Sequence, residues 1–219
     1  LRSHVFEIDM KKLRDGIVDF RKRVLPSCRE KFVELAKQQK PDVLFFTCSD
    51  SRVAPNWFAS TDPGDLFVVR NVGNLVPPAH QDLDPDACES SALAAVEFSI
   101  NILRVSHIVV CGHSDCGAMD YIYSGEKIDS EPHLKSWLKY GVPALESLKS
   151  GVTLNAALSP TNQLSQLNVL QQIEHLKTHS FIRERVKDGQ LEIYGWWFDI
   201  ASAEIHSYEA AQKQFKLIE

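Results

Sequence analysis

The chain alternates short apolar runs with segments in which apolar residues recur at helical spacing. Four runs are almost continuously apolar: residues 42–48, 65–72, 107–113 and 191–200. Runs of this kind are typical of parallel strands that are covered on both faces. We therefore expect an α/β fold with a central, mainly parallel sheet of about four parallel strands plus an edge strand, flanked by helices.

The first forty residues are charged but carry apolar residues at helical spacing, namely Leu13, Ile17, Phe20 and Val24. This spacing predicts an amphipathic helix that Pro26 breaks, followed by a second helix over residues 30–39. We expect residues 1–40 to form a helical arm and residues 41–219 to form the α/β core of a single domain.

Further helices are predicted between the strands, over residues 88–103, 134–140 and 143–149, and as one or two helices over residues 168–189. The last segment contains His175 and His179. Histidines without an obvious partner in sequence are assigned here to surface or capping positions.

Composition narrows the possible partners. The chain has 219 residues, 44% of them hydrophobic, and a net charge of −5 without a run of Lys or Arg. This argues against nucleic acid or an anionic membrane as the main partner, and no apolar stretch reaches membrane-spanning length. The five cysteines are an odd number and favour reduced thiols in an intracellular protein. We expect a cytoplasmic location, with mitochondrial import left open.

Three metal-capable side chains follow predicted strands. Cys48 ends the first strand, His113 ends the third, and Cys116 follows at H-x-x-C spacing. Ligands of open parallel sheets bind at the carboxyl ends of the strands, so these residues can share one crevice. Two thiolates and an imidazole suit Zn²⁺, and three protein ligands leave a fourth position open, as in catalytic sites. Cys88 and Cys111 are expected to be ordinary buried thiols.

Three segments then resemble the β-class carbonic anhydrases. They are "CSDSR" (residues 48–52), "FVVRNVGNLVPP" (residues 67–78) and "IVVCGHSDCGAM" (residues 108–119). The resemblance runs from about residue 31 to residue 200, and "LSQLNVLQQIEHL" and "WWFDI" extend it.

The resemblance implies a zinc enzyme, with one ion per chain, that reversibly hydrates carbon dioxide to bicarbonate and a proton. By the same resemblance Cys48, His113 and Cys116 are the zinc ligands. Asp50 orients the hydroxide on the zinc, and Arg52 holds Asp50 and keeps it off the metal.

The resemblance also implies a substrate pocket and an assembly. The positions that match the pocket of the plant-type members are Gln39, Phe67, Val72, Phe98 and Gly117. Phe98 stands where those enzymes carry a Tyr, and Gly117 is expected to act through its backbone N–H. Family members are dimers or tetramers whose pocket is completed at the dimer boundary, so we expect a homo-oligomer.

One branch of this family is inhibited by bicarbonate and carries a Trp and a Tyr where this chain has Phe45 and Phe198. Arg70 matches the Arg of that inhibitory site. Because the polar groups of that Trp and Tyr are both missing here, we predict that no inhibitory bicarbonate site is present.

Two other functions fit part of the pattern. The same site could hydrolyse carbon disulfide or carbonyl sulfide. A non-catalytic zinc-binding module, redox or structural, could use Cys48, Cys116 and Cys111. The Asp50–Arg52 pair argues against this second alternative, because a structural site has no use for it.

Overall fold

A computed structural model of the protein describes residues 10–79, 91–126 and 128–219. The chain divides into two compact units, Leu1–Lys40 and Pro41–Glu219. Cys88, for which a buried position was expected, lies outside the described residues. None of the helices in the described part of the chain has both the length and the apolar composition needed to cross a bilayer.

The N-terminal unit contains α1 (Met10–Asp19), a π-helical segment (Phe20–Val24) and α2 (Leu25–Leu35). Pro26 lies in the first turn of α2, where its missing N–H group is not needed for a helical hydrogen bond. The expected break at Pro26 is therefore wrong, since the helical conformation continues through it. The second helix also ends at Leu35 and does not reach residue 39.

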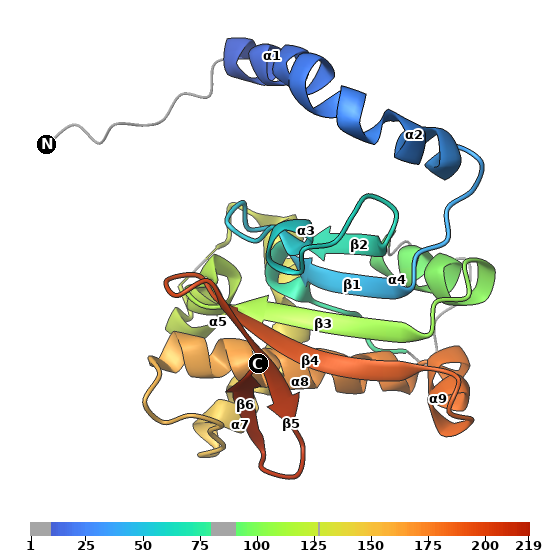
Figure 1. The fold of residues 1–219 in the computed structure, drawn as a ribbon. Helices are drawn as coiled ribbons and strands as arrows, with labels where there is room; N and C mark the ends of the chain where they lie inside the picture. The colour runs from blue at the N-terminus through green and yellow to red at the C-terminus, as the bar shows by residue number, and fades with distance from the viewer. Residues whose placement is uncertain (1–9, 80–90, 127) are drawn as a thin grey trace, which may run out of the picture. The chain divides into compact units, whose positions relative to one another are not determined.

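The second unit is built on a six-stranded sheet in the order β2-β1-β3-β4-β5-β6 (Figure 1). The strands are β1 (Val43–Cys48), β2 (Leu66–Asn71), β3 (His107–His113), β4 (Glu192–Asp199), β5 (Glu204–Glu209) and β6 (Gln214–Leu217). The first four in this order pair in parallel, and β5 and β6 pair antiparallel. The predicted fold class is confirmed, with an antiparallel extension of two strands rather than one.

The helices of this unit vary from a single turn to nineteen residues. They are α3 (Pro55–Phe58), α4 (Ser91–Glu97), α5 (Gly117–Ser124), α6 (Pro132–Leu138), α7 (Val142–Lys149), α8 (Pro160–Thr178) and α9 (Ser180–Lys187). The expected helix over residues 88–103 is, in its described part, α4 followed by a π-helical segment (Phe98–Ile102). Phe98 and Ile102 of this segment lie on the outside, 40% and 66% exposed.

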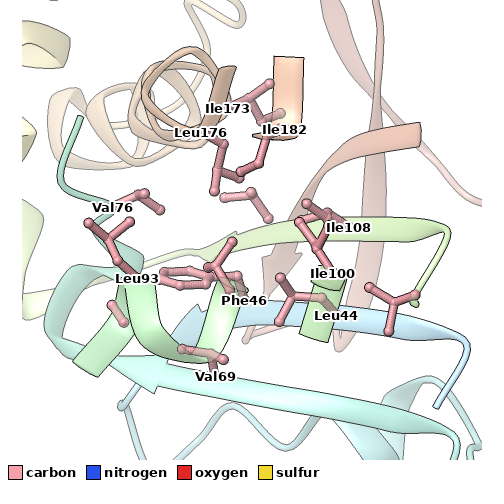
Figure 2. Close-up of a cluster of buried hydrophobic side chains, with 14 of the residues drawn as sticks. Leu44, Phe46, Val69, Val76, Leu93, Ile100, Ile108, Ile173, Leu176 and Ile182 are labelled. Atoms are coloured by element: carbon pink, nitrogen blue, oxygen red, sulfur yellow. The ribbon is translucent and has the colours of Figure 1, made fainter. Parts of the chain in front are cut away.

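The main core lies between one face of the sheet and the helices α4, α8 and α9. Side chains along a strand point alternately to opposite faces of the sheet, so Leu44 and Phe46 of β1 lie on the same face. There they belong to one cluster with Ile108 of β3. Figure 2 shows this cluster, in which Ile173 and Leu176 of α8 and Ile182 of α9 cover the strands. The opposite face carries a smaller aromatic cluster that includes Phe45, Phe198 and Phe58.

Strand register brings the carboxyl ends of the parallel strands to one edge. Cys48 pairs with Asn71 of β2, and His113 pairs with Phe198 of β4. Thr47 pairs with Cys111, so the ends of β1 and β3 lie side by side. Residues that directly follow β1 and β3 therefore gather at the same edge of the sheet.

Candidate metal centre

Three side chains converge at this edge of the sheet. The sulfurs of Cys48 and Cys116 and a ring nitrogen of His113 all lie within 4.8 Å of one another, and all three residues are buried. Among the residues that the structure describes, this is the one group of three or more His, Cys or acidic side chains close enough to bind a single ion. Cys111 is fully buried within β3 and does not belong to it, and burial raises the pKa of its thiol to about 12.

The turn between β3 and α5 positions Cys116. Asp115 has a φ of 53°, a left-handed conformation that Asp tolerates better than most residues. Its N–H donates to Asn162 Oδ1 at 2.8 Å, and its carbonyl accepts from Arg52 Nη2 at 3.0 Å. The buried Ser114 donates to Asp199 Oδ1 at 3.1 Å, which fastens the turn to the end of β4. The turn is thus fixed by hydrogen bonds to Asn162, Arg52 and Asp199.

His113 is oriented with one ring nitrogen free. Its Nδ1 lies 2.8 Å from the Ser114 carbonyl, which can only accept, so Nδ1 carries the hydrogen. Its Nε2 is buried and has no hydrogen-bond partner among the described residues. Buried polar atoms almost always have a partner. A lone pair on a buried, unpartnered imidazole nitrogen beside two sulfurs is the donor set that Zn²⁺ prefers.

The two cysteines differ in the pKa of their thiols. A hydrogen bond from the Cys116 thiol lowers the pKa of Cys48, with contributions from the Gly73 and Asp50 N–H groups. The hydrogen bond to Cys48, together with burial, raises the pKa of Cys116. Of the two thiols, Cys48 is therefore the one that loses its proton more easily. Thiolates are the metal-binding form of cysteine, so a cation would displace any thiol proton that remains.

Asp50 and Arg52 form a forked ion pair beside this group. Arg52 Nε donates to Asp50 Oδ1 at 3.0 Å, and Nη2 donates to Oδ2 at 2.7 Å. The backbone N–H of Arg52 donates to Oδ1 as well, at 2.9 Å. These bonds, the side-chain ones first, lower the pKa of Asp50 to about 2. Asp50 Oδ2 lies 4.0 Å from His113 Nε2, so an ionised carboxylate faces the metal-binding group.

Arg70, a charged residue inside an apolar strand, holds the turn after β1. Its Nε donates to the carbonyl of Cys48 at 3.2 Å, and its Nη2 donates to the carbonyl of Asp50 at 2.7 Å. The turn that carries both the Cys48 thiol and the Asp50 carboxylate is therefore fixed by its backbone. In sequence, the charged position within an apolar run was the one indication of this role.

The segment after β2 approaches Cys48 from the other side. The Asn71 side chain both donates to the Leu75 carbonyl and accepts from the Leu75 N–H, at 2.9 and 2.8 Å, and so closes a tight loop. Inside that loop Gly73 has a φ of 79°, and its N–H donates to Cys48 Sγ at 3.4 Å. A Cβ on Gly73 would lie 3.0 Å from Ala118 Cβ, so only glycine fits. Sequence reasoning assigned no role to Asn71 or Gly73.

The residues predicted to bind substrate are spread over the chain. Val72 lies in the loop beside Cys48 and is 43% exposed, and Gly117 is the first residue of α5, directly after Cys116. Phe67 and Phe98 pack on each other with ring centroids 6.0 Å apart. Phe67 lies near the start of β2, about 13 Å along the strand from Asn71. Gln39 belongs to the N-terminal unit. Within one chain, Val72 and Gly117 therefore lie beside the Cys48–His113–Cys116 group, whereas Phe67 does not.

Comparisons with known proteins agree on one family. A sequence model described as carbonic anhydrase matches residues 43–205. A carbonic anhydrase of Synechococcus elongatus is 38% identical over 201 residues, covering 90% of this chain and 70% of that protein. A carbonic anhydrase of Pseudomonas aeruginosa is 35% identical, covering 94% of this chain and 90% of that protein.

Solved structures agree with the sequence comparisons. The β-carbonic anhydrase CcaA matches with a TM-score of 0.86 at 31% identity, covering 96% of this chain and 92% of that one. One of two tetrameric β-carbonic anhydrases from Sordaria macrospora matches with a TM-score of 0.74 at 28% identity, covering 90% and 96%. The chain therefore belongs to the carbonic anhydrase family, and within that family to the β class.

Proposed function

We propose that this carbonic anhydrase holds Zn²⁺ with Cys48, His113 and Cys116 and catalyses the reversible hydration of carbon dioxide to bicarbonate. The observation that carries the proposal is the buried Nε2 of His113, which has no hydrogen-bond partner in the described part of the chain and lies with two cysteine sulfurs within 4.8 Å of one another. Three ligands leave a fourth tetrahedral position for chemistry, as expected for a catalytic rather than a structural site. When bound, zinc lowers the pKa of a coordinated water to about 7 and so supplies a hydroxide nucleophile at neutral pH.

Asp50 is proposed to orient the nucleophile. Its Oδ1 accepts two hydrogen bonds from Arg52, whereas its Oδ2 accepts one. Oδ2 therefore keeps a lone pair for the O–H of the incoming nucleophile. Because the pKa of Asp50 is about 2, the carboxylate stays ionised and acts as an acceptor only. Arg52 is in turn held by the Asp115 carbonyl, which supports a role in keeping Asp50 from binding the metal itself.

The remaining pocket residues are proposed to serve an uncharged, apolar substrate. Val72 offers an exposed apolar side chain beside the site. Gly117 offers a backbone N–H at the first turn of α5, where helical N–H groups have no partner within the helix. Phe67 and Phe98 pack near the start of β2, away from Cys48 along the strand. We therefore propose a homo-oligomer in which these rings, with Gln39, complete the site of a neighbouring copy, in keeping with the tetrameric relatives from Sordaria macrospora.

The decisive experiment combines zinc analysis with stopped-flow hydration of carbon dioxide at several pH values. The wild type should contain close to one zinc per chain and be active above neutral pH. Cys48→Ser should lose most of its zinc. Asp50→Ala should keep its zinc and lose most of its activity. A zinc-loaded wild type without activity at high pH would overturn the proposal, and a fully active Asp50→Ala would overturn the role of Asp50.

A further inference from the structure

The face of α8 that points into the protein carries polar side chains. Asn168, Gln172 and His175 recur at helical spacing on one face and are at most 7% exposed. We call these three residues the polar row of α8. The expectation that His175 is a surface or capping residue is therefore wrong. Buried amides and imidazoles are costly unless they are hydrogen-bonded, so the partners of this row indicate what it does.

The partners of the row belong to the segment that follows β2. The Val76 N–H donates to Gln172 Oε1 at 2.8 Å, and His175 Nδ1 donates to the Val76 carbonyl at 2.8 Å. Asn168 Nδ2 donates to the Gly73 carbonyl at 3.1 Å. The side chain of Val76 packs with Ile173 and Leu176 of α8 in the main core, which Figure 2 shows. The segment is thus fastened to α8 by both polar and apolar contacts.

Members of the row also hold one another. Gln172 Nε2 donates to Asn168 Oδ1 at 2.9 Å and to the Tyr140 carbonyl at 3.1 Å. The first of these bonds leaves the Asn168 amide nitrogen directed at Gly73, because an amide that accepts at its oxygen donates at its nitrogen. A continuous path of hydrogen bonds therefore leads from Gln172 through Asn168 to the Gly73 carbonyl.

Gly73 connects this path to the metal-binding group. Its carbonyl is held by Asn168, and its N–H donates to Cys48 Sγ. Its left-handed conformation and tight packing against Ala118 allow little adjustment. The orientation of the N–H that reaches the sulfur thus depends on how firmly the segment is held on α8.

We propose that Asn168 and Gln172 are positioning residues of the metal centre, which act by aiming the Gly73 N–H at the Cys48 sulfur. This inference rests on the proposed zinc site. A hydrogen bond to a thiolate withdraws negative charge from the sulfur and fixes its lone pairs. Partners of metal ligands of this kind typically change metal affinity or activity by 10–100-fold when they are removed.

The test compares two neighbouring glutamines of α8. Gln172→Met removes the hydrogen bonds but keeps a side chain of similar length. Gln171→Met is the matched control, because Gln171 is half-buried on the same helix and takes no part in these contacts. Zinc affinity is measured by competition with a chelator, and the cobalt-substituted proteins are compared by their thiolate-to-cobalt charge-transfer absorption. Circular dichroism establishes that each variant is folded.

We expect Gln172→Met to bind zinc about tenfold more weakly and to shift the cobalt charge-transfer band, with both properties unchanged in Gln171→Met. A purely structural role would lower the melting temperature and leave the cobalt band of the folded protein in place. A folded Gln172→Met with wild-type zinc affinity and cobalt spectrum would overturn the inference.

A second variant and the wild type separate the remaining outcomes. If Gln172→Met does not fold, Asn168→Ala decides by the same two measurements, since it removes the direct bond to the Gly73 carbonyl. A wild type that binds no zinc contradicts the proposed function itself. If the wild type and the folded variants bind zinc with the same affinity, only the positioning role is contradicted.

Discussion

Gly112, directly before His113, lies where β3 packs tightly against α8. A single added methyl group at this position tests how tight that packing is. A Cβ at Gly112 would lie 2.7 Å from Val169 Cγ2 and 3.3 Å from the Ser165 carbonyl oxygen and hydroxyl. Val169 is completely buried, and a Cβ at Gly195 of β4 would also come within 3.1 Å of it. We therefore expect Gly112→Ala to displace the Val169 side chain, and α8 with it, from the sheet.

The expected cost follows from this overlap. Adding a methyl group to a tightly packed core costs about 1–3 kcal/mol of unfolding free energy. For a chain of this size that corresponds to a fall in melting temperature of about 2–12 °C. The same displacement would loosen the 2.7 Å hydrogen bond from Ser165 Oγ to the His113 carbonyl, so the affinity for zinc should fall as well.

Gly117→Ala is the matched control. It also changes a glycine next to a candidate metal ligand, but an added Cβ there meets no atom of the described residues within 4 Å. Its unfolding free energy should stay within about 0.5 kcal/mol of the wild type. Thermal unfolding is followed by circular dichroism at one fixed zinc concentration, because bound metal itself raises stability. A Gly112→Ala variant as stable as Gly117→Ala would show that the close approach of α8 and β3 is wrong.

Three further outcomes are expected. Arg52→Lys should keep its zinc but lower kcat/KM about 10–100-fold, because one ammonium group cannot reproduce the two parallel hydrogen bonds to Asp50. Stopped-flow assays and zinc analysis check this, and full activity would contradict it. Burial lowers the pKa of His175, so as the pH falls the imidazole is protonated in the unfolded state before it is in the folded state. The free energy of unfolding should therefore decrease as the pH falls below about 6.5. Denaturant unfolding of the wild type and of His175→Gln should show a flatter pH dependence in the variant, and identical curves would refute this role. Added bicarbonate should not inhibit hydration cooperatively, since Phe45 and Phe198 lie in an apolar cluster, and a sigmoidal inhibition curve would contradict this.

The parallel part of the sheet could be predicted because each of its strands is an apolar run of its own. The positions of Cys48 and His113 at neighbouring strand ends followed from the same reasoning, since the carboxyl ends of parallel strands share an edge. The wider turn at Phe98–Ile102 could not be foreseen, because the apolar spacing there matches an ordinary α-helix. In the same way, Pro26 resembled a helix break but lies in a first turn that accommodates it.

The polar contacts around the site were harder to predict than its ligands. Asn168, Gln172 and His175 are polar residues on a helix, and such residues ordinarily face solvent. Their burial depends on a segment about a hundred residues earlier in the chain, whose backbone groups they satisfy. Local pattern carries no information about a partner so far away. Arg70 was recognisable as unusual, but its acceptors are backbone carbonyls, which no sequence pattern reveals.

The delivery of Cys48 and His113 by two adjacent strands has a consequence for the order of events during folding. The pairing of β1 with β3 joins residues 64 positions apart, as the bond from Thr47 to the Cys111 carbonyl illustrates. Contacts between such distant residues form late and slowly, after long loops have closed. The proposed zinc ion is therefore not expected to nucleate this fold as zinc does in a zinc finger, where closely spaced ligands gather before a core exists. We expect the nascent chain to build its sheet first and the proposed ion to enter a completed site, so a chain that lacks a ligand should still reach its native architecture.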